Sequence, residues 1–251
     1  MNETESARIA LHCLDLTSLN DADTEADIDR LCARALGPCG QVAAVCVWPR
    51  LAAHARRQLP ASIRVAAVAN FPAGDSDAAA ALQDVRAVVA AGAQEIDVVL
   101  PWRALLAGDD AAVSKLLRGV RAASAGFTLK VILETGELQT PERIQHAARL
   151  ALAAGADFLK TSTGKVAVGA TLPAAAAMLD AMRDHPRAGL KLSGGLRRVA
   201  DLPPFLDLVL HERGAQALQP QHFRIGASSL LDDIVAVLGS GPTVPAPAQG
   251  Y

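Results

Sequence analysis

Short apolar runs rich in valine, isoleucine and leucine recur along the chain, and longer segments rich in alanine, leucine, arginine and glutamine separate them. The runs have the length and composition of buried strands, whereas the intervening segments have the composition of helices. The chain is therefore predicted to alternate strand and helix. There are eight runs, at residues 12–17, 41–48, 64–70, 94–100, 127–135, 156–161, 188–195 and 222–227.

Two of the intervening segments carry clear helix boundaries. In the first, Asp75–Asp77 supply capping residues and Gly92 ends the segment; in the second, Thr140 precedes Pro141 and Gly155 follows the last turn. A capping residue, a proline at the first helical position and a glycine after the last turn are typical of a helix. We therefore expect helices from about residue 77 to 91 and from 141 to 154.

The spacing of the strands predicts parallel pairing, because parallel neighbours need a crossover of at least about a dozen residues. Eight strand–helix units in 251 residues match the number and length of a (β/α)8 TIM barrel, here a single domain over residues 1–238. A doubly wound open sheet is the alternative, but it usually has fewer strands and often a GxGxxG turn, which this sequence lacks. Residues 239–251 change to glycine, proline and small side chains, which predicts a flexible tail ending in Tyr251.

Charge and composition exclude several classes of function. The net charge is -2 and aromatic residues make up 3% of the chain, so the electrostatic and stacking features of a nucleic-acid-binding protein are absent. No apolar stretch reaches the roughly 18 residues needed to cross a membrane, and the first residues do not resemble a signal peptide. We expect a cytoplasmic protein that binds neither nucleic acid nor membrane.

The cysteines favour neither a metal site nor a disulfide framework. All four lie between Cys13 and Cys46, with no CxxC pair and no histidine cluster at zinc-ligand spacing. Reduced thiols are the simpler interpretation. The six histidines are scattered, and none is assigned a catalytic role.

Two of the five lysines stand at the ends of predicted neighbouring strands, and they are the first candidates for chemistry. Lys160 ends the sixth strand and Lys191 lies on the seventh, so both are expected at the carboxyl end of the barrel, where such enzymes act. Two ammonium groups in a partly dry pocket disfavour each other's charge, so one should give up its proton more readily. A neutral amine attacks a carbonyl carbon and forms a Schiff base. Ordinary solvated or ion-paired lysines are the alternative.

Asp97 is the matching candidate for proton transfer, because it lies inside the apolar run EIDVV, where a charge is costly unless paired. A structural carboxylate bonded to backbone amides is the alternative. Lys130 is interpreted as structural. Glu134 either supports the neighbourhood of Lys160 or stabilises its own loop.

Three glycine-containing segments after the last three strands predict an anion site: TGK at 163–165, SGGLRR at 193–198 and IGASS at 225–229. Glycines let backbone N–H groups approach a phosphate, and serines at a helix start add donors. The loops after strands seven and eight are the usual phosphate site of such barrels. A phosphorylated small substrate is therefore expected, although Lys165 could instead cap its loop and the serines could form a simple helix N-cap.

The segments LDLTSLN, CVWPR, NFPAG, EIDVVLPWRALLAG, VILETGEL, DFLKTSTGK, GLKLSGG and RIGASSLL resemble those of the deoxyribose-phosphate aldolases, class I aldolases with a barrel fold, and follow the family's order from residue 14 to 231. The resemblance implies reversible aldol cleavage of 2-deoxy-D-ribose 5-phosphate to D-glyceraldehyde 3-phosphate and acetaldehyde, without cofactor or metal. It also implies a homodimer. Another phosphate-binding barrel aldolase or isomerase, or a non-catalytic phospho-sugar-binding barrel, remain the alternatives.

The resemblance also implies roles for individual residues. Lys160 matches the Schiff-base lysine, Lys191 the second lysine that makes the first easier to deprotonate, and Asp97 the acid of the proton relay. Cys46 lies near the site without an essential role, and Tyr251 matches a mobile tyrosine tail that reaches back to the site. The positions implied to bind substrate are Asp15 and Thr163 for the sugar hydroxyls, and Gly164, Lys165, Gly194, Gly195, Ser228 and Ser229 for the phosphate.

The chain departs from the family's long-tailed members in one loop: Leu192 and Ser193 stand where those members have proline and alanine. The departure bears on the stiffness of the loop and leaves the lysine and the glycines in place.

Overall fold

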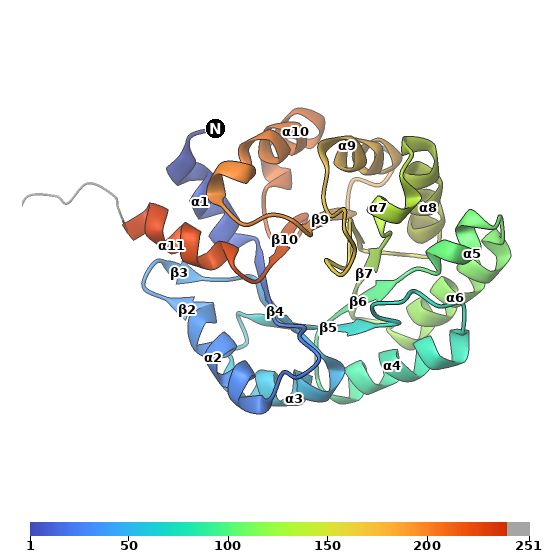
Figure 1. Ribbon diagram of the computed structural model, residues 1–251, viewed down its shortest axis with the longest axis horizontal. Coiled ribbons are helices and arrows are strands. Elements are labelled where there is room, and N and C mark those ends of the chain that lie inside the picture. The colour runs from blue at the N-terminus through green and yellow to red at the C-terminus, as the bar shows by residue number, and fades with distance from the viewer. Residues whose placement is uncertain (240–251) are drawn as a thin grey trace, which may run out of the picture.

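Eight parallel strands close into a barrel in the order β1-β10-β9-β8-β7-β6-β5-β4, and helices form a ring outside it (Figure 1). The structure, a computed structural model, describes residues 1–239. The predicted (β/α)8 barrel is confirmed, and each predicted apolar run contains one barrel strand. The strands are β1 (Leu14–Thr17), β4 (Ala44–Val47), β5 (Arg64–Ala69), β6 (Glu95–Val99), β7 (Thr128–Ile132), β8 (Phe158–Lys160), β9 (Gly189–Ser193) and β10 (Phe223–Ala227).

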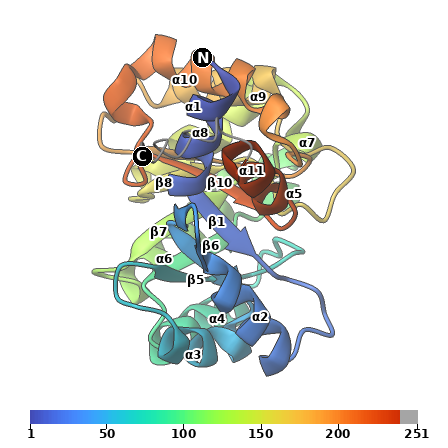
Figure 2. The same cartoon turned by 90° about the vertical axis from the view of Figure 1, so that its left-hand side faces the viewer.

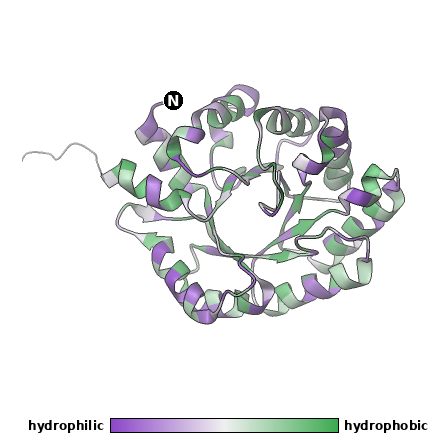
Figure 3. Ribbon diagram, in the orientation of Figure 1, coloured by the Kyte–Doolittle hydropathy of each residue, from purple (hydrophilic) through white to green (hydrophobic). Residues whose placement is uncertain are grey.

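The helices pack their apolar sides on the strands and carry hydrophilic residues on their outer faces (Figure 3). Both helices predicted from their boundaries are confirmed, one capped by Asp77 and the other by Thr140 with Pro141 in its first turn. The helices are α1 (Glu3–His12), α2 (Glu25–Ala35), α3 (Pro49–Gln58), α4 (Ala78–Ala90), α5 (Trp102–Leu106), α6 (Asp110–Ala123), α7 (Thr135–Leu138), α8 (Pro141–Ala153), α9 (Leu172–Ala181), α10 (Pro203–Arg213) and α11 (Leu230–Gly239), with short 3-10 turns η1 (Val199–Asp201) and η2 (Ala215–Ala217).

Two elements at the N-terminal side differ from the prediction. The chain begins with α1, which packs against α11 beside the barrel (Figure 2), so the predicted first strand starts after His12. The second run, 41–48, is split: Gln41 pairs with Leu36 in a hairpin of β2 (Leu36–Gly37) and β3 (Gly40–Gln41), and the barrel strand begins at Ala44. The predicted tail lies outside the described residues apart from Gly239, which is the last residue of α11.

The barrel interior is polar, and the hydrophobic core lies between the strands and the helices. Lys130 and Lys191 are among the largest completely buried side chains. Asp15 and Asp97 are also completely buried. Burying a charge is costly unless it is paired, so the strands hold these side chains for their mutual contacts.

Candidate active site

The carboxyl ends of the strands and the loops that follow them surround a cavity of about 340 Å³. Lys160 reaches this cavity from the end of β8, Thr17 from the end of β1, and Asn20 from the segment after β1. The predicted substrate residues that line the same cavity are Thr163, Gly164, Lys165, Gly194, Gly195, Ser228 and Ser229. The structure thus brings Lys160 and the three predicted anion segments together.

The glycine segments have the backbone conformation that an anion site requires. Gly164, Gly194 and Gly195 have φ values of 76°, 88° and 87°, a left-handed region that favours glycine. Ser228 and Ser229 directly precede α11, so the positive end of its helix dipole faces the cavity. Glycine-containing loops, two serines and a helix N-terminus therefore line the same cavity.

Hydrogen bonds fix the loop after β8. Thr163 Oγ1 accepts from the backbone N–H of Lys165 at 3.0 Å, and Lys165 Nζ donates to the carbonyl of Leu19 at 2.8 Å. Ser193, one of the two departures from the family pattern, donates from Oγ to the carbonyl of Ser162 at 2.5 Å. Ser193 is the last residue of β9, so this contact joins the end of β9 to the loop after β8, and the departure lies on a strand rather than in a loop.

Glu134 also supports this loop. It is completely buried at the end of β7, and its Oε1 accepts from Ser162 Oγ at 2.7 Å and from the backbone N–H of Thr163 at 3.1 Å. Its φ of 56° places its backbone in the left-handed region, which is uncommon outside glycine. Of the two alternatives left open by the sequence, these contacts favour support of the segment that follows Lys160.

Asp97 lies at the centre of a cluster of amines below the cavity. Its Oδ2 accepts from Lys160 Nζ at 2.8 Å and from Lys191 Nζ at 2.7 Å, and its Oδ1 accepts from Lys130 Nζ at 2.9 Å. Cys46 Sγ lies 3.9 Å from Asp97 Oδ2, and burial raises the pKa of this thiol. The three predicted catalytic residues therefore meet, and Lys130 joins them.

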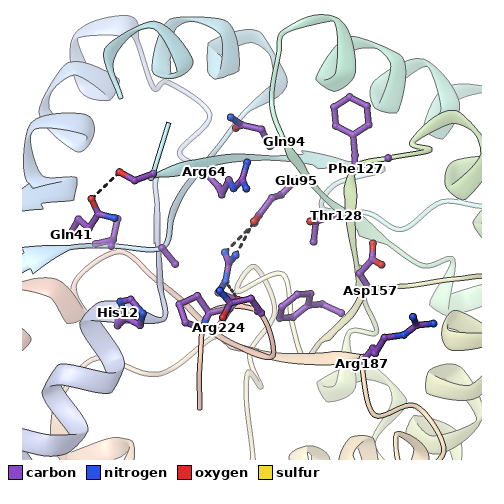
Figure 4. A pocket seen from close by; sticks show the side chains of 17 residues that line it. His12, Gln41, Arg64, Gln94, Glu95, Phe127, Thr128, Asp157, Arg187 and Arg224 are labelled. Carbon is purple, nitrogen blue, oxygen red and sulfur yellow. Dashed lines mark hydrogen bonds and ion pairs between the residues drawn. The ribbon is translucent and has the colours of Figure 1, made fainter. Parts of the chain in front are cut away.

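Further ion pairs continue the cluster to the opposite end of the barrel. Asp15 Oδ2 pairs with Lys191 Nζ at 2.5 Å, and its Oδ1 pairs with Arg224 Nη1 at 2.6 Å. Glu95 pairs with Arg224 Nη2 at 2.8 Å and with Lys130 Nζ at 2.6 Å. Arg224 and Glu95 lie at the floor of a second cavity of about 660 Å³, lined by the starts of the strands (Figure 4). Barrel enzymes act at the carboxyl ends of the strands, so the smaller cavity is the candidate active site.

The cluster holds more positive than negative groups. Within residues 1–239, ion pairs connect four cations and three carboxylates, so the fully ionised cluster carries one uncompensated positive charge. Its members are Lys130, Lys160, Lys191, Arg224, Asp15, Glu95 and Asp97.

Most of these charges are fixed by their partners. Burial by itself raises the pKa of a carboxyl, but the adjacent cations hold the pKa values of Asp15, Glu95 and Asp97 below their usual range. Burial by itself lowers the pKa of a cation, but the adjacent carboxylates raise the pKa values of Lys130, Lys191 and Arg224. Lys191 is therefore protonated beside Lys160 when no substrate is bound.

Some predicted residues lie apart from the cavity. Asp15 does not line it, because its carboxylate is held below by Lys191 and Arg224. Its contact with a sugar hydroxyl therefore stays a prediction. Tyr251 lies outside the described residues.

The sequence analysis did not single out Glu95 or Arg224. It interpreted Lys130 as structural, and the structure places this lysine in the buried cluster with Asp97 and Glu95. The available signal was the spacing of Glu95 and Asp97, since residues two apart on a strand point to the same side. Lys130 and Arg224 similarly interrupt apolar runs.

The arrangement defines a class of enzyme. A lysine at the mouth of a β/α barrel, with a cationic neighbour and an anion site, is typical of aldolases that bind their substrate as a Schiff base. The comparison with protein families agrees: residues 9–235 match the model of the DeoC/LacD family of aldolases. The chain belongs to this family, and it is an aldolase and hence a lyase.

Individual relatives extend over nearly the whole chain. A deoxyribose-phosphate aldolase of Agrobacterium fabrum is 45% identical over 251 residues, covering 98% of this chain and 96% of that protein. A solved structure assigned as a deoxyribose-phosphate aldolase of Toxoplasma gondii ME49 has a TM-score of 0.88 and 26% identity, covering 97% of this chain and 98% of the other. A tetrameric deoxyribose phosphate aldolase of Aeropyrum pernix has a TM-score of 0.71 and 26% identity, with coverages of 95% and 93%.

Within residues 1–239, no helix has both the length and the apolar character needed to span a membrane. The predicted cytoplasmic location stays a prediction.

Proposed function

We propose that this protein catalyses the reversible cleavage of 2-deoxy-D-ribose 5-phosphate to D-glyceraldehyde 3-phosphate and acetaldehyde, with Lys160 as the Schiff-base residue. The observation that carries the proposal is the position of Lys160: it joins a cluster with one excess positive charge and also lines the cavity that holds the anion segments. An amine in this position can attack the carbonyl carbon of a phosphorylated sugar held in the cavity.

The chemistry follows from this position. Lys160 Nζ attacks the aldehyde carbon of the open-chain sugar, and loss of water gives an iminium ion. The bond between C2 and C3 then breaks as the C3 hydroxyl loses its proton, and the iminium takes up the electron pair as an enamine. Protonation at C2 and hydrolysis release acetaldehyde and the free amine.

Asp97 and Lys191 are proposed to carry the protons. Asp97 Oδ2 is shared by Lys160 at 2.8 Å and Lys191 at 2.7 Å, so one carboxylate oxygen connects the reacting nitrogen with a fixed proton donor. The phosphate is proposed to bind the loops with Gly164, Gly194 and Ser229. Lys165 adds a positive charge beside them.

Reductive trapping tests the proposal. The protein is incubated with acetaldehyde and borohydride, digested and examined by mass spectrometry. We expect one ethyl group on the peptide that contains Lys160, no adduct in Lys160→Ala, and a normal adduct in Lys115→Ala, which changes an exposed lysine of α6. Absence of the adduct, or its location on another lysine, contradicts the proposal.

The homodimer is also proposed rather than observed, because a single chain is described and a solved relative is tetrameric. Light scattering of the purified protein tests it. A mass of one or four chains contradicts the dimer.

A further inference from the structure

Arg224 closes the cluster at the end of the barrel opposite the active site. Its Nη1 contacts Asp15 Oδ1 at 2.6 Å. Its Nη1 also contacts Glu95 Oε2 at 3.1 Å, and its Nη2 contacts Glu95 Oε1 at 2.8 Å (Figure 4). Its Nε donates to the carbonyl of Pro220 at 2.5 Å. The side chain is 7% exposed, so this positive charge is buried and held by its partners.

The carboxylates are distributed unequally among the cations. In the described part of the chain, Lys130 forms ion pairs with three carboxylates, and Lys191 and Arg224 each form ion pairs with two. Lys160 pairs only with Asp97, which it shares with the two other lysines. Arg224 therefore pairs with two carboxylates whose negative charge would otherwise compensate the positive charge of the lysines.

We infer that Arg224 is a positioning residue that favours the neutral amine of Lys160 from the opposite end of the barrel. This inference rests on the proposed role of Lys160 as the nucleophile. With Arg224 the ionised cluster carries one excess positive charge, and the cheapest way to remove it is loss of the proton from the cation with the fewest carboxylate partners. Without Arg224, three cations would face three carboxylates, and Lys160 would keep its proton.

The groups that share contacts with the Lys160–Asp97 pair are not expected to change their charge near neutral pH. Asp97 on β6 contacts Lys160 directly, and Lys130 on β7, Lys191 on β9 and Cys46 on β4 contact Asp97. Asp15 on β1 pairs with Lys130 and Lys191, and Lys165 and Arg197 line the same cavity as Lys160. The two other lysines and the two carboxylates keep their charges because each is paired, and burial raises the pKa of the thiol, which stays neutral.

The expected effect is measurable. Arg224 pairs in register with Lys191, and Lys191 pairs with Lys160, so two strand spacings of about 5 Å separate β10 from β8. A unit charge about 10 Å away, at an effective dielectric constant of about 20, shifts a protonation midpoint by on the order of one pH unit.

The experiment measures the pH at which the rate of borohydride-trapped adduct formation with acetaldehyde is half-maximal, together with the pH profile of sugar-phosphate cleavage. Arg224→Met should raise this midpoint by about one pH unit, and Glu95→Gln, which removes a negative charge, should lower it. The double variant Arg224→Met with Glu95→Gln restores the excess of one positive charge, so its midpoint should return close to that of the wild type. Arg224→Lys keeps the charge and should keep the midpoint.

If Arg224 has only a structural role, its replacement lowers the rate of adduct formation, and the pH midpoints of Arg224→Met and Glu95→Gln do not shift in opposite directions. Unmoved midpoints, or shifts of Arg224→Met and Glu95→Gln in the same direction, overturn the inference. If Arg224→Met alone does not fold, the comparison of Glu95→Gln with the double variant decides, because the double variant must lie higher by about one pH unit. A wild-type protein without an adduct on Lys160 refutes the proposed function, whereas an adduct with unmoved midpoints refutes only the role of Arg224.

Discussion

Replacement of Asp97 by asparagine tests how strongly the buried ion cluster stabilises the barrel. Asp97 is completely buried and contacts three lysines at 2.7, 2.8 and 2.9 Å. Removing one partner of a buried ion pair costs about 3–5 kcal/mol, because the remaining charge is left without compensation. For a domain of this size, each kcal/mol changes Tm by about 2–4 °C, so we expect Asp97→Asn to lower Tm by roughly 6–20 °C.

The control is Asp232→Asn, which breaks an exposed pair with Arg34 of similar length, 2.7 Å. Exposed pairs contribute about 0–1 kcal/mol, so this variant should melt within a few degrees of the wild type. Thermal unfolding followed by circular dichroism compares the two. Equal melting temperatures for Asp97→Asn and Asp232→Asn would refute the reasoning.

The same variant has an expected dependence on pH. The pKa values of Asp15, Glu95 and Asp97 are lowered in the folded protein from ordinary values of 3.8, 4.5 and 3.8. A carboxyl with a lowered folded-state pKa contributes stability that is complete above its unfolded pKa and is lost as the pH falls toward the folded value. Urea unfolding should therefore show a difference between the wild type and Asp97→Asn that is constant from pH 7 to about 5 and narrows below about 4. A difference that stays constant down to pH 3 contradicts the assignment.

Three further predictions concern the cavity and the packing around it. Lys165→Met should raise KM for the phosphorylated sugar but not for free deoxyribose, because only the phosphate needs the added charge. Glu134→Ala should raise KM about tenfold with a smaller change in kcat, because a loop amide loses its acceptor, and Glu134→Gln should partly restore it. Gly189→Ala should cost about 1–3 kcal/mol, because its Cβ would lie 2.2 Å from the ring of Phe158, whereas Gly119→Ala, within α6, should stabilise.

Each of these has a simple measurement. Steady-state kinetics with both sugars tests Lys165→Met, and equal losses for the two would exclude a phosphate contact. The effects on KM and on kcat, measured separately, test Glu134, with Glu137→Ala in the adjacent helix α7 as the control. If glutamine does not restore KM, a positioning role is contradicted. Thermal melts test the glycines, and equal changes in Tm would show that the clash is relieved by movement.

The alternation of strand and helix was predictable because each strand is a buried apolar run and each helix has its own capping residues. The confirmed barrel follows from this periodicity, and the DeoC/LacD family assignment confirms the resemblance to deoxyribose-phosphate aldolases. The hairpin of β2 and β3 was missed because strands of two residues have no periodicity to detect. Helix α1 was missed because its buried side consists largely of small residues, including Ala7 and Ala10.

The convergence of Lys160, Lys191 and Asp97 was predictable, because the end of a parallel strand fixes the end of the barrel to which its side chains belong. The partners of each group were not, because they come from distant parts of the chain: Arg224 contacts Glu95 across 129 residues of sequence and Asp15 across 209. Register around the closed barrel decides these contacts. A strand pattern indicates which side chains point inward and leaves open which of them meet.

Stability and chemistry have different sources in this barrel. The apolar layer between strands and helices, with residues such as Val65, Ile96 and Leu129 completely buried, stabilises the fold. In the barrel interior, which the strands enclose, ion pairs take the place of apolar side chains. Replacing a buried ion pair by well-packed hydrophobic residues is often neutral or stabilising. The cluster is therefore poorly explained by stability alone. Its arrangement, with Lys160 at the edge that meets the cavity, fits the proposed role of Lys160 as the nucleophile.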